Sequence, residues 1–280
     1  MLESPAVGPG LPERPSVLRQ DDVGVWYCFT EDAAESDCGA AYGLLSDAER
    51  ARCRRFRFEE DRVSFILAHA LLRTALSRHA AATAGEWSFS TSGHGRPEID
   101  WPPTHPPLRF NLSHTRGLVA CAVTLERDVG IDVERIGRRA GTGALAERHF
   151  SSSEKLVLAS LPSTGADALF FSLWTLKEAY VKARGVGLGL PLDVASFQVV
   201  PGAPPAVSFG PGHGEDARAW QFALLEPRPG YRLAVAARRE VGAEIDFGFS
   251  PVARPPGCDS VSSNMAPPPA PGGFGHLMPA

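Results

Sequence analysis

Residues 108–134 read LRFNLSHTRGLVACAVTLERDVGIDVE, and this stretch decides the fold. Leu108–Leu112 and Leu118–Leu125 are mainly apolar runs separated by a short segment that contains a glycine. Two such runs around a glycine-containing turn predict a β-hairpin. Ile131 and Val133 then alternate with acidic residues, which predicts a further strand. With helices predicted on either side, we expect antiparallel sheet and an α+β fold class.

The acidic residues of the last strand are Asp132 and Glu134. A strand has a side-chain period of two, so both carboxylates lie on the same face. The segment 174–182, WTLKEAYVK, has helical character, and Glu178 and Lys182 are four residues apart on one helix face. Mg²⁺ is usually held by a few carboxylates together with substrate phosphates. Three carboxylates, with a lysine to balance phosphate charge, predict a magnesium and pyrophosphate site.

Each motif alone also has a simpler interpretation. An Asp-x-Glu pair on a strand is most often part of a solvated sheet face. Glu178 and Lys182 could form an ordinary surface pair that contributes about 0.2–0.5 kcal/mol. The two motifs together, with the polar cluster of Asn111, Ser113 and His114 just upstream, favour a functional site.

The surrounding segments predict an element order that occurs twice. In the first half, Val23–Phe29 is expected to be a strand, Ser46 and Glu49 to form a capping box, and Asp61–His79 to be a helix. The elements expected in the second half are a helix at Leu169–Arg184, a strand at Ser196–Val200, and a hairpin of Trp220–Leu225 with Tyr231–Ala237. Duplicated halves would pack face to face and leave a cleft between them.

The chain therefore divides into four predicted segments. These are an N-terminal tail at residues 1–20, an N-terminal α+β half at 21–126, a C-terminal α+β half at 127–248, and a C-terminal tail at 249–280. Five of the first twelve residues are proline or glycine, and the final segment is rich in Pro, Gly and Ser. Both tails are expected to be disordered, because such composition cannot bury enough apolar surface to order the chain.

Composition sets the remaining bounds. A chain of 280 residues that is 44% hydrophobic and 21% charged can bury one large core or two small ones. No apolar run approaches the ~18 residues of a membrane helix, and the start lacks a signal peptide, so we expect a cytoplasmic protein without a membrane partner. Five cysteines without zinc-like spacing indicate reduced thiols. A net charge of -4 argues against nucleic-acid binding.

With these motifs in this order, the chain resembles the 4′-phosphopantetheinyl transferase superfamily, of the surfactin-synthetase-activating type. The matching residues, within roughly residues 22–240, are Arg96-Pro97, Phe110–His114, Gly130–Glu134, Trp174–Lys182 and the following Gly185–Leu188. The resemblance implies two pseudo-twofold-related subdomains, each an antiparallel sheet plus helix, with coenzyme A in an active-site cleft between them. It also implies transfer of the 4′-phosphopantetheine arm of coenzyme A to a carrier-domain serine, which releases adenosine 3′,5′-bisphosphate.

The resemblance implies roles for single residues. The implied ligands of Mg²⁺, or of Mn²⁺ in its place, are Asp132, Glu134 and Glu178. Lys182 would contact the leaving phosphate, and the general base would be Glu178 or a metal-bound water. The implied contacts to the phosphates and the nucleotide end of coenzyme A are Arg52, Arg96, Ser113 and His114. Arg96 stands where the family usually has a lysine, and Glu49 where a second basic residue can occur, while Lys177 should point away from Glu178.

Two other functions stay open. One is a different magnesium-dependent phosphoryl or nucleotidyl transferase, although the chain has no Walker-type or Rossmann glycine pattern. The other is a non-catalytic carrier-binding module, which would not need the three carboxylates and Lys182. The expected partners are acyl or peptidyl carrier domains and coenzyme A as co-substrate, and the resemblance implies a monomer. The sequence does not identify which synthase is served.

Overall fold

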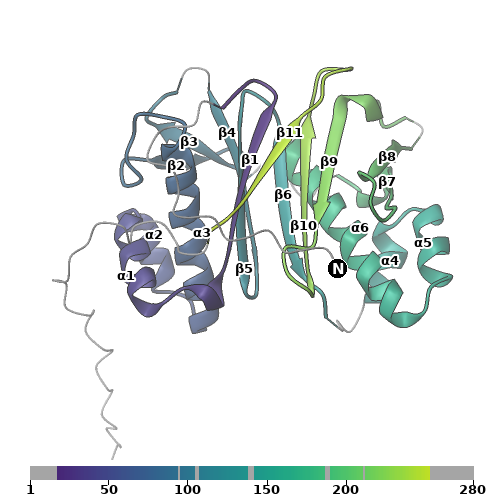
Figure 1. Cartoon of the computed structure of the whole chain (residues 1–280), viewed down its shortest axis with the longest axis horizontal. Helices are drawn as coiled ribbons and strands as arrows, with labels where there is room; N and C mark the ends of the chain where they lie inside the picture. Colours follow the sequence, from purple (N-terminus) through teal and green to yellow (C-terminus); the bar gives the residue numbers. More distant parts are fainter. Residues whose placement is uncertain are drawn as a thin grey trace, which may run out of the picture.

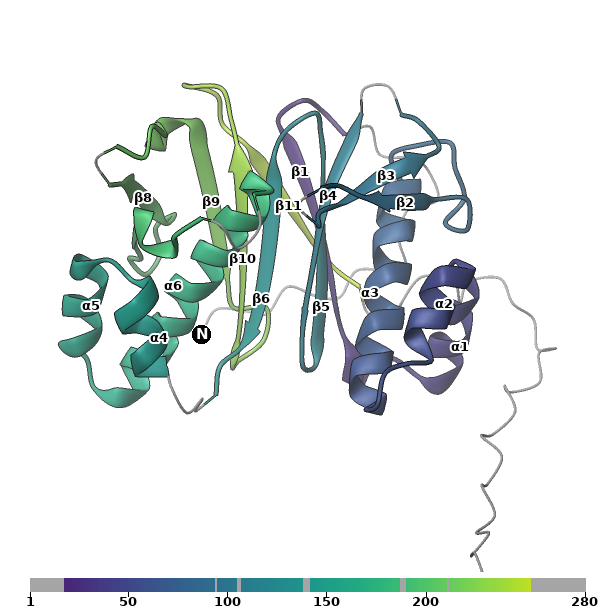
Figure 2. The same ribbon diagram turned by 180° about the vertical axis from the view of Figure 1, so that it is seen from behind.

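The computed structural model describes residues 18–93, 95–104, 107–137, 142–186, 190–210 and 212–252. Two β-sheets face each other at the centre, and helices cover the outer face of each sheet (Figures 1 and 2). Within the described residues, no helix has the length and apolar character that crossing a membrane requires. Residues 1–17 and 253–280 of the predicted tails, and Gly187-Leu188 of the glycine segment, lie outside the described residues.

The first sheet has the strand order β11-β1-β5-β4. Its strands are β1 (Asp22–Phe29), β4 (Leu108–Thr115), β5 (Leu118–Leu125) and β11 (Asp246–Pro251). The helices beside it are α1 (Glu35–Leu44), α2 (Asp47–Cys53) and α3 (Glu59–Ser77), and a separate ribbon consists of β2 (Ser88–Thr91) and β3 (Pro97–Trp101). The predicted hairpin is confirmed, because β4 pairs with β5 from Leu108 opposite Leu125 to Thr115 opposite Leu118.

The predicted capping box at the start of α2 is also confirmed. The Ser46 hydroxyl accepts a hydrogen bond from the Glu49 amide at 3.3 Å, and the Glu49 carboxylate accepts one from the Ser46 amide at 2.7 Å. Glu49 also pairs at 2.7 Å with the guanidinium of Arg73, a buried residue of α3. The acidic residue at this position therefore fastens α2 to α3.

The second sheet has the strand order β6-β10-β9. Its strands are β6 (Val129–Arg135), β9 (Trp220–Leu225) and β10 (Tyr231–Arg238). The other elements of this half are α4 (Thr142–His149), α5 (Ser152–Ala159), α6 (Ser163–Arg184), β7 (Ala195–Gln198) and β8 (Ala206–Phe209). The predicted hairpin of β9 and β10 is confirmed, and the predicted helix at Leu169–Arg184 begins earlier, at Ser163.

The space between the two sheets is filled by apolar side chains of both. Ile131 and Val133 of β6 are buried here, together with Leu118 of β5 and Leu233 of β10. Because side chains alternate along a strand, the intervening residue Asp132 faces the opposite way, toward α6. The apolar residues of β6 thus contribute to the core, and its acidic residues lie on the opposite face, where they can form a site.

The structure differs from the predicted start of the C-terminal tail at residue 249. Residues 249–251 belong to β11, which pairs with β1 in parallel, Asp22 opposite Asp246 and Tyr27 opposite Pro251. Val252 is buried in the hydrophobic core that the first sheet forms with α1, α2 and α3. The strand escaped prediction because its pairing partner lies at the far end of the chain and its composition is similar to that of the residues that follow.

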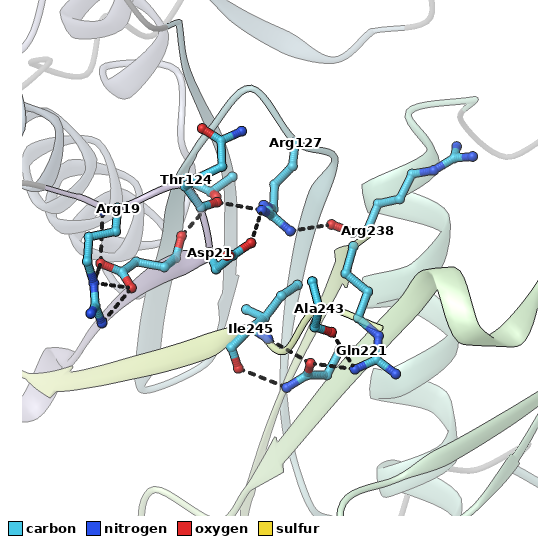
Figure 3. Close-up of polar contacts among 11 residues, drawn as sticks. Arg19, Asp21, Thr124, Arg127, Gln221, Arg238, Ala243 and Ile245 are labelled. Atoms are coloured by element: carbon cyan, nitrogen blue, oxygen red, sulfur yellow. Dashed lines mark hydrogen bonds and ion pairs between the residues drawn. The ribbon is translucent and has the colours of Figure 1, made fainter. Parts of the chain in front are cut away.

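A buried arginine fastens the joint between the two sheets (Figure 3). Arg127 lies between β5 and β6, and its side chain is only 10% exposed. It donates hydrogen bonds at 2.9 Å to the carboxylate of Asp21, just before β1, and at 2.9 Å to the carbonyl of Arg238, at the end of β10. One guanidinium therefore links the connection between β5 and β6 to the start of β1 in the first sheet and to the end of β10 in the second.

Candidate active site

The site begins with an unusually close approach of α6 to β6 at Gly130. A β-carbon placed there would lie 2.0 Å from the carbonyl oxygen of Ala179 and 2.4 Å from the amide nitrogen of Ala183. Only glycine leaves room for the helix backbone at this distance. The approach brings Glu178 and Lys182, which immediately precede Ala179 and Ala183 in α6, over the face of β6 that carries Asp132.

Three elements meet at one hydrogen-bonded cluster. The Lys182 ammonium, from α6, donates to Asp132 Oδ1 at 2.6 Å and to Ser113 Oγ at 3.0 Å. The Ser113 hydroxyl, from β4, donates to the same Asp132 oxygen at 3.0 Å. The Val133 amide of β6 donates to Ser113 Oγ at 3.3 Å. The structure therefore brings together Ser113, Asp132 and Lys182, three of the residues predicted from sequence.

Asp132 and Glu178 have the chemistry of a site for a hard cation. Asp132 Oδ2 is buried and has no hydrogen-bond partner among the residues that the structure describes. The pKa of Glu178 is raised, first by burial and then by the nearby Asp132, while Lys182 acts in the opposite direction. Two neighbouring carboxylates with an unpartnered oxygen fit a divalent cation that completes its shell with substrate oxygens.

The third predicted ligand, Glu134, lies two residues along β6 from Asp132, opposite Arg232 of β10. In the part of the chain that the structure describes, no three His, Cys, Asp or Glu side chains come close enough to form a complete metal cage. The donor set that Asp132 and Glu178 provide is therefore partial.

His114 lies at the same end of the cluster, and Arg52 of α2 lies within its electrostatic reach. The pKa of His114 is lowered, chiefly by desolvation and then by Lys182, and Arg52 lowers it further. Asp61 and Asp132 oppose these effects. Arg52 also stacks over the ring of Phe65, with 5.4 Å to the ring centroid. With the two cations Lys182 and Arg52 nearby, this imidazole is a suitable place for an anionic group.

Arg96 occupies a different position, at the C-terminal end of α6. Its guanidinium donates to the carbonyl of Ala183 at 3.4 Å, lies 4.0 Å from Asp128, and packs against Gly185. It also lines an open cavity of about 340 Å³ together with Phe110. Among the described residues, the polar contacts of the Arg96 guanidinium are thus with the end of the helix and with Asp128.

Two polar residues of this region were not given a role from the sequence. Asn111 Oδ1 accepts a hydrogen bond at 2.9 Å from the Ile131 amide. Glu154 pairs at 2.8 Å with Lys177, and both side chains are essentially unexposed. Lys177 therefore points away from the site, as predicted. The Ser-x-x-Glu spacing of Ser151 and Glu154 signals the capping box that α5 has, but not the buried ion pair.

Two family models match the chain. Residues 128–236 match the model described as 4′-phosphopantetheinyl transferase superfamily. Residues 32–126 match the one described as 4′-phosphopantetheinyl transferase, N-terminal.

Among curated proteins, the chain is 33% identical over 242 residues to the 4′-phosphopantetheinyl transferase HetI of Nostoc sp., covering 86% of this chain and 95% of that protein. It is 31% identical over 194 residues to the 4′-phosphopantetheinyl transferase Sfp of Bacillus subtilis, covering 69% and 82%.

Solved structures give weaker likenesses. The holo-[acyl-carrier-protein] synthase of Thermotoga maritima is 24% identical, with a TM-score of 0.33 over 40% of this chain and 63% of that one. The synthase of Bacillus anthracis, in complex with CoA (3′,5′-ADP), is 18% identical, with a TM-score of 0.34 over 40% and 96%.

Proposed function

Because this chain belongs to the 4′-phosphopantetheinyl transferase superfamily, it transfers the phosphopantetheine arm of coenzyme A to carrier proteins, and we propose that Asp132, Glu178 and Lys182 carry the reaction. The observation that supports this assignment best is the 2.6 Å contact between Lys182 and Asp132, beside the carboxyl group of Glu178. The two segments of sequence that suggested a pyrophosphate site meet at this contact.

The reaction makes one P–O bond and breaks another. A carrier serine oxygen attacks the pantetheine-side phosphorus of coenzyme A, and the bond to the second phosphate breaks to release adenosine 3′,5′-bisphosphate. Such a reaction needs alignment and charge neutralisation more than covalent chemistry. The Lys182 ammonium stabilises the negative charge that develops on the leaving phosphate. The serine proton passes to Glu178, whose raised pKa in the metal-free protein favours proton uptake, or to a water at the site.

Asp132 and Glu178, joined by Glu134, are the residues we propose to hold Mg²⁺, with Mn²⁺ as an alternative. The unpartnered Asp132 Oδ2 and the mutual repulsion of the two carboxylates support this proposal. When bound, the cation supplies positive charge to the pyrophosphate oxygens. The protein's own part is to hold the two carboxylates close to each other and beside Lys182.

His114 and Arg52 are proposed to bind the phosphates, and Arg96 the nucleotide end of coenzyme A. The cationic surroundings of His114 support the first assignment, and the cavity beside Arg96 supports the second. We further propose a pseudo-twofold relation between the two halves, supported by a helix-backed sheet in each half. Because apolar side chains fill the space between the two sheets, the proposed cleft lies beside this packed interface, where β4, β6 and α6 meet. A monomer would suffice for this arrangement.

The partner class is proposed to be the acyl or peptidyl carrier domains of nonribosomal peptide, polyketide or related synthases. The test is the intact mass of such domains after incubation with this protein, coenzyme A and Mg²⁺. We expect a gain of one phosphopantetheine on serine, and its loss with a chelator or with the near-isosteric Asp132→Asn variant. Turnover of nucleotides without coenzyme A would favour another phosphoryl or nucleotidyl transferase, and a mass gain unaffected by Asp132→Asn would reject the assigned residues.

A further inference from the structure

The free edge of β6 is closed by side chains rather than by another strand. β6 is the outer strand of its sheet, and among the described strands only β10 pairs with it there. On its other side, the Ile131 amide donates to Asn111 Oδ1 at 2.9 Å and the Val133 amide donates to Ser113 Oγ at 3.3 Å. An amide left unpaired at a buried sheet edge costs free energy, so these two hydrogen bonds stabilise the fold.

The geometry of two strands explains why the motif has this spacing. Asn111 and Ser113 are two residues apart on β4 and therefore point to the same side. Ile131 and Val133 are two residues apart on β6 and present their amides to that side. The two side chains thus continue the hydrogen-bonding pattern of the second sheet from the first. Asp132 lies between the two anchored amides.

The hydroxyl of Ser113 has no capacity left for a ligand. A serine hydroxyl can donate one hydrogen bond and accept two. Ser113 Oγ donates to Asp132 Oδ1 and accepts from Lys182 and from the Val133 amide. Ser113 is only 5% exposed and Asn111 only 9%. A phosphate could bind this hydroxyl only by displacing a contact that holds the site together.

We infer that Asn111 and Ser113 are positioning residues that fix Asp132, and that Ser113 does not act as the phosphate ligand that the resemblance implies. Together they hold the backbone of β6 on both sides of Asp132, and Ser113 holds Oδ1, so that Oδ2 stays free for a cation. This inference rests on the proposed metal role of Asp132. The phosphate contact is left to His114, the next residue of β4, to which the proposed function already assigns it.

The test separates metal affinity from coenzyme A affinity. Mn²⁺ is titrated into the full chain, with and without coenzyme A, and the free ion is measured by electron paramagnetic resonance. Coenzyme A binding is measured by calorimetry in the presence of a chelator. Ser113→Ala and Asn111→Ala should weaken Mn²⁺ binding by about 10–100-fold, as losses of supporting contacts around metal ligands do, and leave metal-free coenzyme A affinity unchanged. Ser113→Thr, which keeps the hydroxyl, should bind Mn²⁺ like the wild type.

The opposite pattern would overturn the inference: coenzyme A affinity lost without metal, and Mn²⁺ affinity unchanged. If an alanine variant fails to fold, Ser113→Cys replaces it, because a thiol fills the site with a somewhat larger group that is only a weak donor and acceptor. Wild-type Mn²⁺ affinity in that variant would also overturn the inference. The carrier mass assay is independent of both measurements. If the wild type modifies carriers but the variants bind Mn²⁺ as tightly as the wild type, only the positioning roles are rejected. If the wild type does not modify carriers, the proposed function is rejected.

Discussion

At the scale of a single residue, Glu178 is a group whose ionisation opposes folding. Its folded-state pKa lies above its ordinary value, because the side chain is buried and faces Asp132. The folded protein therefore holds this proton more tightly than the unfolded chain does. By linkage, the contribution of Glu178 to stability is lost as the pH rises from the unfolded pKa, about 4.3, through the raised folded pKa.

Glu178→Gln should therefore stabilise the metal-free protein while abolishing carrier modification. We expect a higher Tm than the wild type at neutral pH with a chelator present, and a shrinking difference as the pH falls toward the unfolded pKa, where the wild-type group is protonated. Thermal melts over a pH series would measure it. Glu244→Gln, at an exposed position, is the matched control. A lower Tm for Glu178→Gln at neutral pH would contradict the electrostatic account.

The proximity of Asp132, Glu178 and Lys182 could be predicted because the periods of a strand and a helix place them, and because their segments resemble a family motif. The saturation of Ser113 could not be predicted. The Ser113 oxygen is saturated because groups from β6 and α6 come within hydrogen-bond distance of it in the folded protein. Such long-range contacts cannot be seen in a single sequence.

At the scale of elements, the contact between α6 and β6 sets the geometry of the site. Besides Gly130, the strand β10 presents the small buried residues Ala234 and Ala236 to the same helix core. A sheet surface of small side chains lets a helix backbone lie close. The absence of large side chains from this sheet surface thus fixes the distance from Asp132 to Glu178 and Lys182 of α6.

Gly130→Ala should disturb both stability and activity. The added carbon would meet helix backbone, which cannot turn aside as a flexible side chain would. We expect a loss of about 1–3 kcal/mol, typical of overpacking, and a strong loss of carrier modification because Glu178 and Lys182 move. Urea unfolding and the mass assay measure the two effects. At Gly165, which lies in α6, an added β-carbon would meet only Leu161 Cβ, at 3.8 Å, among the described atoms, so Gly165→Ala should leave activity intact. Equal behaviour of the two variants would refute this account.

The elements differ in how far they could be predicted. The hairpins β4–β5 and β9–β10 were predicted correctly because their partners are neighbours in the sequence. β11 was missed because its partner β1 is at the opposite end of the described chain, and parallel pairing over that distance leaves no local pattern. The close approach at Gly130 was likewise invisible, since a glycine in a strand has several structural reasons.

At the scale of the whole molecule, the last described strand completes the first sheet. A chain truncated after residue 253 keeps β11 and Val252 and should retain the wild-type Tm and activity, as the composition of the C-terminal tail predicts. A chain truncated after residue 245 loses the strand that covers β1 and should melt at a clearly lower temperature. Melting curves of both chains would decide, and a similar Tm for the two would show that β11 contributes little.

The pairing of β1 with β11 also has a consequence for how the protein is made. β1 leaves the ribosome early, yet the strand that covers its edge emerges only after some two hundred further residues. At about 5–20 residues per second, that delay is on the order of tens of seconds. Throughout it, the nascent chain carries the largely apolar β1 with one side unpaired, a template on which other chains can aggregate. Proteolytic clipping before residue 246 would recreate this state in the finished protein. We therefore expect a chain without β11 to self-associate before it loses enzymatic activity.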